Sequence, residues 1–137
     1  MSRPSLDRIR HRAPTMMLAA LFAASGTLHL IRPGIFLPLV PAALPAPEAI
    51  ILASGVAELA CAVGLGARAP WAGPASALLL VAVFPGNVSF ALDVAADPAT
   101  SPLLVAAAWA RLPLQAPLIW AAMQARRHRA GGPWRSG

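Results

Sequence analysis

The sequence predicts an all-α fold: a four-helix bundle embedded in a membrane, with both termini in the cytoplasm. Of the 137 residues, 58% are hydrophobic and only 12% are charged, so polar residues are too few to cover a soluble domain. The apolar residues fall into four long runs. The arginines instead gather before the first run and after the last, as basic residues do around membrane spans.

Four helices are predicted because each apolar run is about long enough to cross the hydrocarbon core of a bilayer. Their expected ranges are 15–31, 49–65, 71–92 and 102–124. They form one transmembrane domain over 15–124, flanked by basic cytoplasmic tails over 1–14 and 125–137. Pro14 is expected to end the first tail. The first run also fits a signal peptide, but no small-residue cleavage site followed by polar sequence comes after it, which favours a retained helix.

The longest connection, 32–47, is both proline-rich and apolar. Its five prolines exclude a regular helix. Because its other residues are mostly apolar, it is expected either to lie at the membrane interface or to fold over the mouth of the bundle as a lid. A tight turn over 66–70 and a short acidic loop over 93–101 make the other two connections.

The arginines also predict the orientation of the chain. Nine of the eleven lie in the two tails or in the second connection, which the positive-inside rule assigns to the cytoplasm. An even number of spans agrees with this assignment. The same placement favours contacts with anionic lipid over nucleic acid as a partner. The predicted location is the cell (cytoplasmic) membrane, which the chain crosses several times.

Glu58 interrupts the second apolar run at its centre. A charged group there costs about 2.5–3.5 kcal/mol on insertion scales, so a partner is expected. Arg111 is the expected partner, because it is the only charged residue inside the last run and both residues lie about nine positions from the same side of the bundle. The pair is either a structural ion pair, or part of a binding site for a polar head group or a proton-coupled redox ligand.

Further polar side chains are expected to converge with this pair in the same half of the bundle. Ser54 shares a helix face with Glu58, and Gln115 shares one with Arg111. The candidate ligand-binding residues are His29, Ser54, Glu58, Asn87, Arg111 and Gln115. No catalytic residue is assigned.

Prolines inside the predicted helices leave backbone carbonyl groups without their usual donors. Pro85 does this to the carbonyl of Val81, and Pro113 does it to that of Trp109. In lipid such groups must be satisfied by neighbouring side chains or by a cavity. The prolines therefore add backbone acceptors to the expected polar region.

The chain offers no evident redox pair or metal site. Its single cysteine, Cys61, lies in mid-helix among small residues, which indicates a packing role and excludes an intrachain disulfide. His29 has neither a second histidine nor a carboxylate cluster at the spacing of metal ligands, so no metal is expected.

Several short motifs of this chain resemble those of the DoxX family of small four-helix membrane proteins. The matching segments are Gly26-Thr27-Leu28-His29 and Pro33, Val40-Pro41 and Leu44-Pro45, Ser54-Gly55-Val56-Ala57-Glu58-Leu59, Gly64-Leu65-Gly66, Val83-Phe84-Pro85-Gly86-Asn87-Val88, and Arg111-Leu112-Pro113-Leu114-Gln115. Each is short, but together they occur in order over about residues 15–124. Gly86, where the family often has alanine, is a departure of small expected consequence.

The resemblance implies a four-helix membrane bundle with a loose link to membrane redox systems. Relatives in that family include a subunit of a thiosulfate:quinone oxidoreductase and a partner in a membrane oxidoreductase complex. Carried over residue by residue, the motifs imply His29, Glu58, Asn87, Arg111 and Gln115 as site positions.

These observations lead us to expect an accessory subunit or ligand-binding membrane protein rather than an enzyme acting alone. Its ligand would be a small amphipathic molecule, with a quinone as the candidate cofactor. The alternative is a quinone-reducing subunit, whose electrons must come from a membrane or peripheral oxidoreductase partner because no CxxC, haem-ligand pair or flavin motif is present. A small-molecule transporter is a third reading, which the lack of an evident internal repeat disfavours. The oligomeric state stays open.

Overall fold

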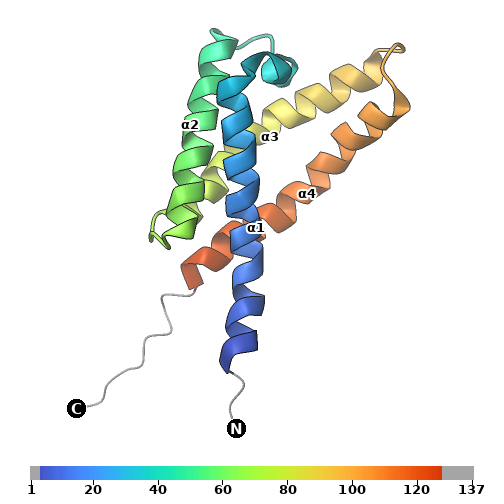
Figure 1. Cartoon of the computed structure of the whole chain (residues 1–137). Helices are drawn as coiled ribbons and strands as arrows, with labels where there is room; N and C mark the ends of the chain where they lie inside the picture. Colours follow the sequence, from blue (N-terminus) through green and yellow to red (C-terminus); the bar gives the residue numbers. More distant parts are fainter. Residues whose placement is uncertain (1–3, 128–137) are drawn as a thin grey trace, which may run out of the picture.

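Residues 4–127 fold into five helices, four of them long and apolar (Figure 1). The structure is a computed structural model that describes the backbone of residues 4–127 and the side chains of residues 12–125. The elements in chain order are α1 (Pro4–Ile31), the short 3₁₀ helix η1 (Pro33–Leu39), α2 (Pro47–Gly66), α3 (Ala72–Ala96) and α4 (Pro102–Arg127). No strand occurs over residues 4–127. The predicted all-α fold with four long apolar helices is confirmed.

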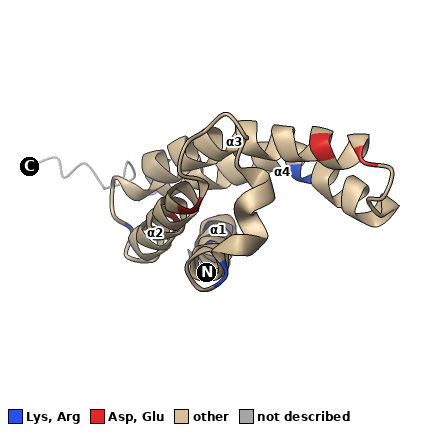
Figure 2. Cartoon of the chain, turned by 90° about the horizontal axis from the view of Figure 1, so that it is seen from above, with Lys and Arg blue, Asp and Glu red and all other residues tan. Residues whose placement is uncertain are grey.

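The four long helices form two antiparallel hairpins, α1–α2 and α3–α4 (Figure 1). The hairpins meet near the turn between α2 and α3 and diverge toward η1, as the view along α1 also shows (Figure 2). We call these two ends of the molecule the turn end and the η1 end. The arrangement differs from an evenly packed bundle, because the hairpins share a core over only part of their length.

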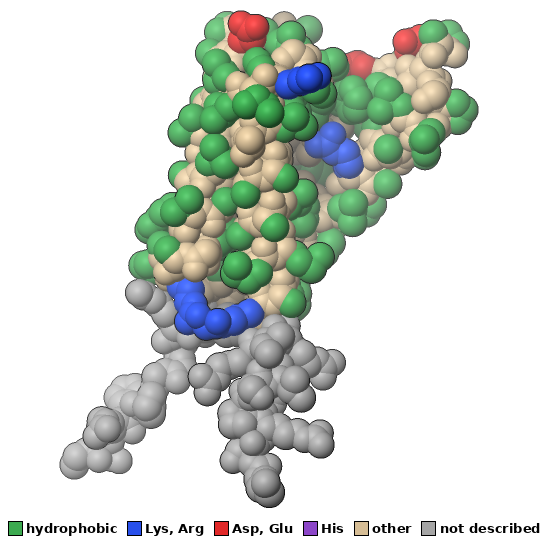
Figure 3. Space-filling model, in the orientation of Figure 1, with side chains coloured by type: hydrophobic (Ala, Val, Ile, Leu, Met, Phe, Trp, Pro, Cys, Tyr) green, Lys and Arg blue, Asp and Glu red, His purple; other side chains and the backbone are tan. Residues whose placement is uncertain are grey.

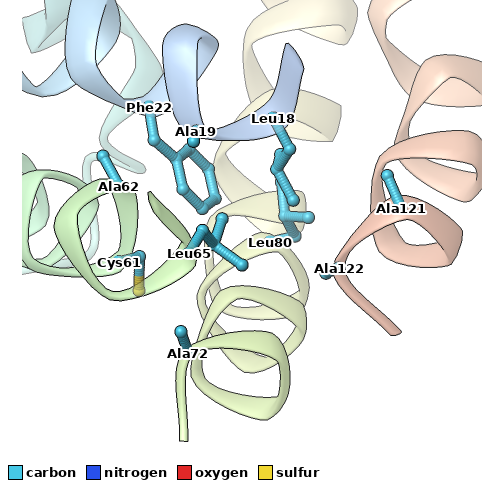
Figure 4. Packing of buried hydrophobic residues seen from close by; sticks show 10 residues of the cluster. All are labelled: Leu18, Ala19, Phe22, Cys61, Ala62, Leu65, Ala72, Leu80, Ala121 and Ala122. Atoms are coloured by element: carbon cyan, nitrogen blue, oxygen red, sulfur yellow. The ribbon is translucent and has the colours of Figure 1, made fainter. Parts of the chain in front are cut away.

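The shared core lies toward the turn end and takes small or apolar residues from all four long helices (Figure 4). Leu18 of α1 is 1% exposed and packs in one cluster with Leu80 of α3 and Ala122 of α4. Cys61 is a buried free thiol in this cluster, which agrees with a packing role. A second cluster at the η1 end is built by α3 and α4 alone, from Ala91, Val94 and Ala108. The four long helices therefore share a core at the turn end only.

The helix α1 begins eleven residues before the range predicted for it. It starts at Pro4 and passes through Pro14, which was expected to end a basic tail over 1–14. Pro14 removes one helical hydrogen bond, to the carbonyl of residue 10. That carbonyl lies before the apolar segment Arg12–Ile31. Outside this segment, water can replace the missing donor. Of the predicted second tail, 125–137, the first three residues belong to α4, and the part from residue 128 onward lies outside the described residues.

The proline-rich connection contains the 3₁₀ helix η1, although its prolines were expected to exclude a regular helix. A 3₁₀ helix tolerates this sequence because it is short and Pro33 stands at its start, where no helical donor is needed. The helix packs against α1, α2 and α3, as a lid would. The backbone carbonyl of Leu39, at the end of η1, lies against Gly86 of α3. A Cβ added to Gly86 would lie 2.5 Å from the oxygen of this carbonyl. The glycine at 86 is therefore required, contrary to the small consequence expected.

The connection between α3 and α4 is shorter than the predicted acidic loop over 93–101. The helix α3 continues to Ala96. Asp97 then accepts a hydrogen bond from the backbone N–H of Ala99 at 2.9 Å, and the Ser101 hydroxyl accepts one from Leu104 at 3.3 Å. Serine at this position is a common start of a helix, because it satisfies a free backbone donor. The two hydrogen bonds place the loop at 97–101.

The surface of the chain is largely apolar (Figure 3). Four helices are long and apolar enough to cross a membrane, and the described part of the chain buries little of them. The buried share is 33% in Pro47–Gly66 and falls to 11% in Pro102–Ala125. Exposed large apolar side chains on all four would be solvated by lipid tails in a multi-pass membrane protein.

Candidate acid–base site under the 3₁₀ helix

The closest approach of α1 and α2 occurs at two facing glycines. A Cβ added to Gly26 would lie 2.7 Å from the carbonyl oxygen of Gly55, and one added to Gly55 would lie 2.8 Å from the Cβ of His29. Only hydrogen fits between these backbones, since real Cβ contacts are longer. This contact brings the side chains one turn further along each helix, His29 and Glu58, into reach of each other.

His29 and Glu58 form a buried acid–base pair. The Nδ1 atom of His29 lies 3.2 Å from Oε2 of Glu58, and their side chains are only 12% and 10% exposed. Ser25 stands one turn before His29, and its hydroxyl lies 3.3 Å from the same Nδ1. Burial of an ionisable pair within apolar helices is costly and marks a candidate site.

The hydrogen bonds of His29 leave an oxygen of Glu58 without a donor. Nδ1 lies 2.8 Å from the carbonyl oxygen of Ser25, which can only accept, so we place the ring hydrogen on Nδ1 and directed at that carbonyl. The buried Oε2 of Glu58 consequently has no hydrogen-bond partner within the described part of the chain. In the neutral ring the second nitrogen, Nε2, is then also an acceptor.

The 3₁₀ helix covers this pair with an aromatic ring. Phe36 of η1 stacks on the imidazole of His29, with ring centroids 3.8 Å apart and planes 19° apart. The stack closes the site toward the η1 end, while the Gly26–Gly55 contact closes it between the helices. Phe36 and Ser25 were both missed at sequence level. Ser25 could have been found from its spacing of four residues to His29 on one helix face.

Arg111 is not the direct partner of Glu58, and this expectation is corrected. The side chain of Arg111 is exposed, and His29–Glu58 is the only ion pair within 4.0 Å that the structure shows among residues 12–125. The expectation assumed that α2 and α4 run parallel, so that equal numbers of positions place two residues side by side. In the structure α4 diverges from α2 toward the η1 end, which separates Arg111 from Glu58 (Figure 1). Arg111 still attracts the Glu58 carboxylate at longer range, more weakly than His29 does.

The other predicted residues are separate from the pair. The amide nitrogen of Gln115 donates to the backbone carbonyl of Leu80, one residue before the carbonyl that Pro85 was expected to expose. Gln115 therefore ties α4 to α3. Ser54 and Asn87 are half-buried, with no side-chain hydrogen bond among the described residues. Of the six candidates, the structure brings His29 and Glu58 together.

No group of three or more His, Cys, Asp or Glu side chains that could hold a metal ion is found over the described range. A shallow depression at the start of α2 is lined by Leu37, Glu48 and neighbouring residues and includes none of the six candidates. The buried pair, rather than this depression, is the better site candidate because it combines burial with an unpaired polar atom.

The geometry predicts that Glu58 is coupled to His29 and not to Arg111. In a double-mutant cycle, Glu58→Gln and His29→Gln should depart from additivity by about 0.5–3 kcal/mol in the free energy of unfolding, because the groups are in contact. The matched cycle of Glu58→Gln with Arg111→Gln should be additive to within about 0.5 kcal/mol. Unfolding in mixed detergent micelles measures both. A larger coupling to Arg111 than to His29 would restore the original pairing.

The described residues thus define an all-helical protein with four helices that are long and apolar enough to cross a membrane, and with an acid–base pair buried between two of them. The chain belongs to the family described as a domain of unknown function, DUF8561, whose model matches residues 18–126. Comparison with curated proteins and with solved structures finds no match. The resemblance to the DoxX family stays a prediction.

Proposed function

We propose that this chain is a DoxX-type multi-pass protein of the cell membrane, with both termini in the cytoplasm. In this proposal it acts as an accessory subunit that binds a small amphipathic ligand at the His29–Glu58 pair. The placement of nine of eleven arginines supports the orientation. Both ends of the described chain lie at the same end of the molecule, as an even number of spans requires (Figure 1).

One observation carries the binding function: the Glu58 carboxylate is buried and keeps an oxygen without a donor. Unpaired buried acceptors are costly in a low-dielectric interior and are few in native structures, so this one needs an explanation. A purely structural ion pair would direct a hydrogen of His29 at that oxygen. Here that hydrogen is directed at Ser25, so the pair is better suited to receive a donor from elsewhere.

A quinone fits this site best in its hydroxyl form. An oxidised quinone offers only carbonyl acceptors, whereas the free positions of the pair, Oε2 of Glu58 and Nε2 of His29, are acceptors as well. A quinol carries two hydroxyl donors and a flat ring. Its hydroxyl can donate to Glu58, and its ring would take the place of Phe36 in the stack on His29.

The second candidate function is a quinone-reducing or quinol-oxidising subunit of a membrane oxidoreductase. The acid–base pair favours it, because a carboxylate and an imidazole in contact can exchange protons with a hydroxyl group. The electrons would then come from, or pass to, a partner protein. Quinol turnover by the purified chain, with an added electron acceptor and without a partner, would favour this function over the accessory role.

Replacement of Glu58 by methionine should weaken quinol binding by about tenfold to a hundredfold. Methionine has a similar length but offers no comparable acceptor, so a bound hydroxyl would lose its hydrogen bond at a cost of about 1–3 kcal/mol. Titration of a short-chain benzoquinol into purified protein in neutral detergent measures the affinity. Wild-type protein should bind the reduced form more tightly than the oxidised form.

The matched control is Glu48→Met, which removes an exposed carboxylate at the start of the same helix and should leave affinity unchanged. Equal affinities of wild type and Glu58→Met for the quinol would contradict the proposed site. Equal binding of the oxidised and reduced forms would contradict the proposed hydrogen-bond direction.

A further inference from the structure

Arg111 is an exposed cation in the middle of an apolar helix. It lies on α4, which buries the smallest share of its apolar segment, and no carboxylate oxygen lies within 4.0 Å of it among the described side chains. Asp93 on the facing helix α3 is also exposed and does not pair with it. Because Glu58 acts on Arg111 only at longer range, this cation within a membrane is left open to an anionic partner from outside the chain. This argument rests on the membrane placement in the proposed function, but not on quinol binding.

The divergence of the hairpins creates an opening at the η1 end. Figure 3 shows this opening as a hollow between the two hairpins, with apolar side chains on both sides and a basic side chain within it. Among the arginines whose side chains the structure describes, Arg111 alone lies inside an apolar segment, because Arg12 is the first residue of one, Arg32 follows α1 and Arg68 lies in the turn between α2 and α3. The acidic residues at this end lie away from the middle of α4: Asp93 and Asp97 lie near the connection between α3 and α4, and Glu48 lies at the start of α2.

We propose that an anionic phospholipid occupies the opening, with its phosphate on Arg111 and its acyl chains against the apolar walls. A guanidinium group binds phosphate oxygens in a two-pronged geometry, and lipid supplies the phosphate without a second protein. The opening also widens from the shared core toward η1 (Figure 1). A helix from a partner keeps a constant diameter of about 10–12 Å and fits such a wedge poorly, whereas acyl chains adapt to it.

The depth of Arg111 is compatible with a phosphate group. Nine positions separate it from Pro102 at the start of α4, which is about 14 Å along the helix axis. The helix is inclined to α1 and α2, so the depth below the membrane surface is smaller than this length (Figure 1). The long side chain of an arginine then reaches toward the head groups.

Native mass spectrometry of protein taken from mixed phosphatidylglycerol and phosphatidylcholine bilayers tests the proposal. Wild type should retain phosphatidylglycerol in preference to phosphatidylcholine, and Arg111→Gln should reduce this preference about tenfold, as loss of one charge-assisted contact implies. Arg111→Lys keeps the charge and should retain most of the preference. Arg68→Gln, an exposed arginine in the turn between α2 and α3, is the control and should match wild type. The basic tails can also bind anionic lipid and are the same in all variants. The effect of Arg111 is therefore the difference in lipid preference between variants.

Equal preferences in Arg111→Gln and Arg68→Gln would overturn the proposal. Equal retention of phosphatidylglycerol and phosphatidylcholine by wild type would also overturn it, and this measurement does not depend on the folding of any variant. A second polypeptide retained by wild type and lost in Arg111→Gln would show that a protein fills the opening, and would overturn it too. Quinol affinity measured on the same samples separates failure here from failure of the proposed function.

Discussion

Replacement of Leu18 by alanine should lower the free energy of unfolding by about 2–3 kcal/mol, the largest effect expected here. Leu18 is 1% exposed and packs in the shared core with Leu80 and Ala122, so its loss leaves a cavity where the two hairpins join (Figure 4). The value lies near the lower end for buried leucines. In a micelle the unfolded chain keeps its apolar residues in hydrocarbon, so mainly packing is lost.

Leu21→Ala is the matched control for this change. Leu21 lies one turn further along the same helix and is 47% exposed, so its truncation removes the same atoms without opening a core cavity. We expect less than about 0.5 kcal/mol from it. Unfolding of both variants in mixed micelles gives the comparison. Equal losses for Leu18→Ala and Leu21→Ala would show that the shared core does not hold the hairpins together.

Replacement of Gly26 by alanine should destabilise the chain by about 1–3 kcal/mol, because the new methyl group would meet the backbone of Gly55 at 2.7 Å. A backbone oxygen within a helix cannot move aside alone, so α1 and α2 must separate. Separation also moves His29 away from Glu58, so quinol affinity should fall together with stability. Unfolding in micelles and quinol titration of the same preparation measure both effects.

Gly66→Ala separates this steric effect from the helix preference of alanine. No atom lies within 4 Å of a Cβ placed at Gly66, and no glycine of the described chain has a positive φ. Alanine there should be neutral or stabilise by up to about 1 kcal/mol, through its higher helix propensity. A stabilising Gly26→Ala would mean that the two helices cross further apart than the structure shows.

The all-helical fold could be predicted from the sequence because apolar runs of about twenty residues leave few alternatives to helices. Helix ends were less accessible. Pro14 stands within α1 and Pro33 opens a 3₁₀ helix, since a proline removes one donor but does not by itself end a helix. The divergence of the hairpins could not be predicted, because it depends on which small residues meet in the shared core.

The candidate site could be predicted in part. Glu58 is conspicuous as a carboxylate in an apolar run, and His29 was among the candidates, but the pairing of Glu58 with Arg111 was wrong. Counting positions along helices gives the level of a residue and not its direction or the tilt of its helix. The pairing depends instead on Gly26 and Gly55, whose significance appears only when the two backbones are seen in contact.

Gly86 links parts of the chain that are distant in sequence. Its missing side chain lets the Leu39 carbonyl settle on α3, and the same short helix carries Phe36 onto the imidazole of His29. A methyl group at position 86 would push η1 away from α3 and lift Phe36 from the imidazole of His29. Residue 86 would have this effect without contacting the His29–Glu58 pair itself. The shielding of His29, in the α1–α2 hairpin, thus depends on the lack of a side chain at Gly86 in the α3–α4 hairpin.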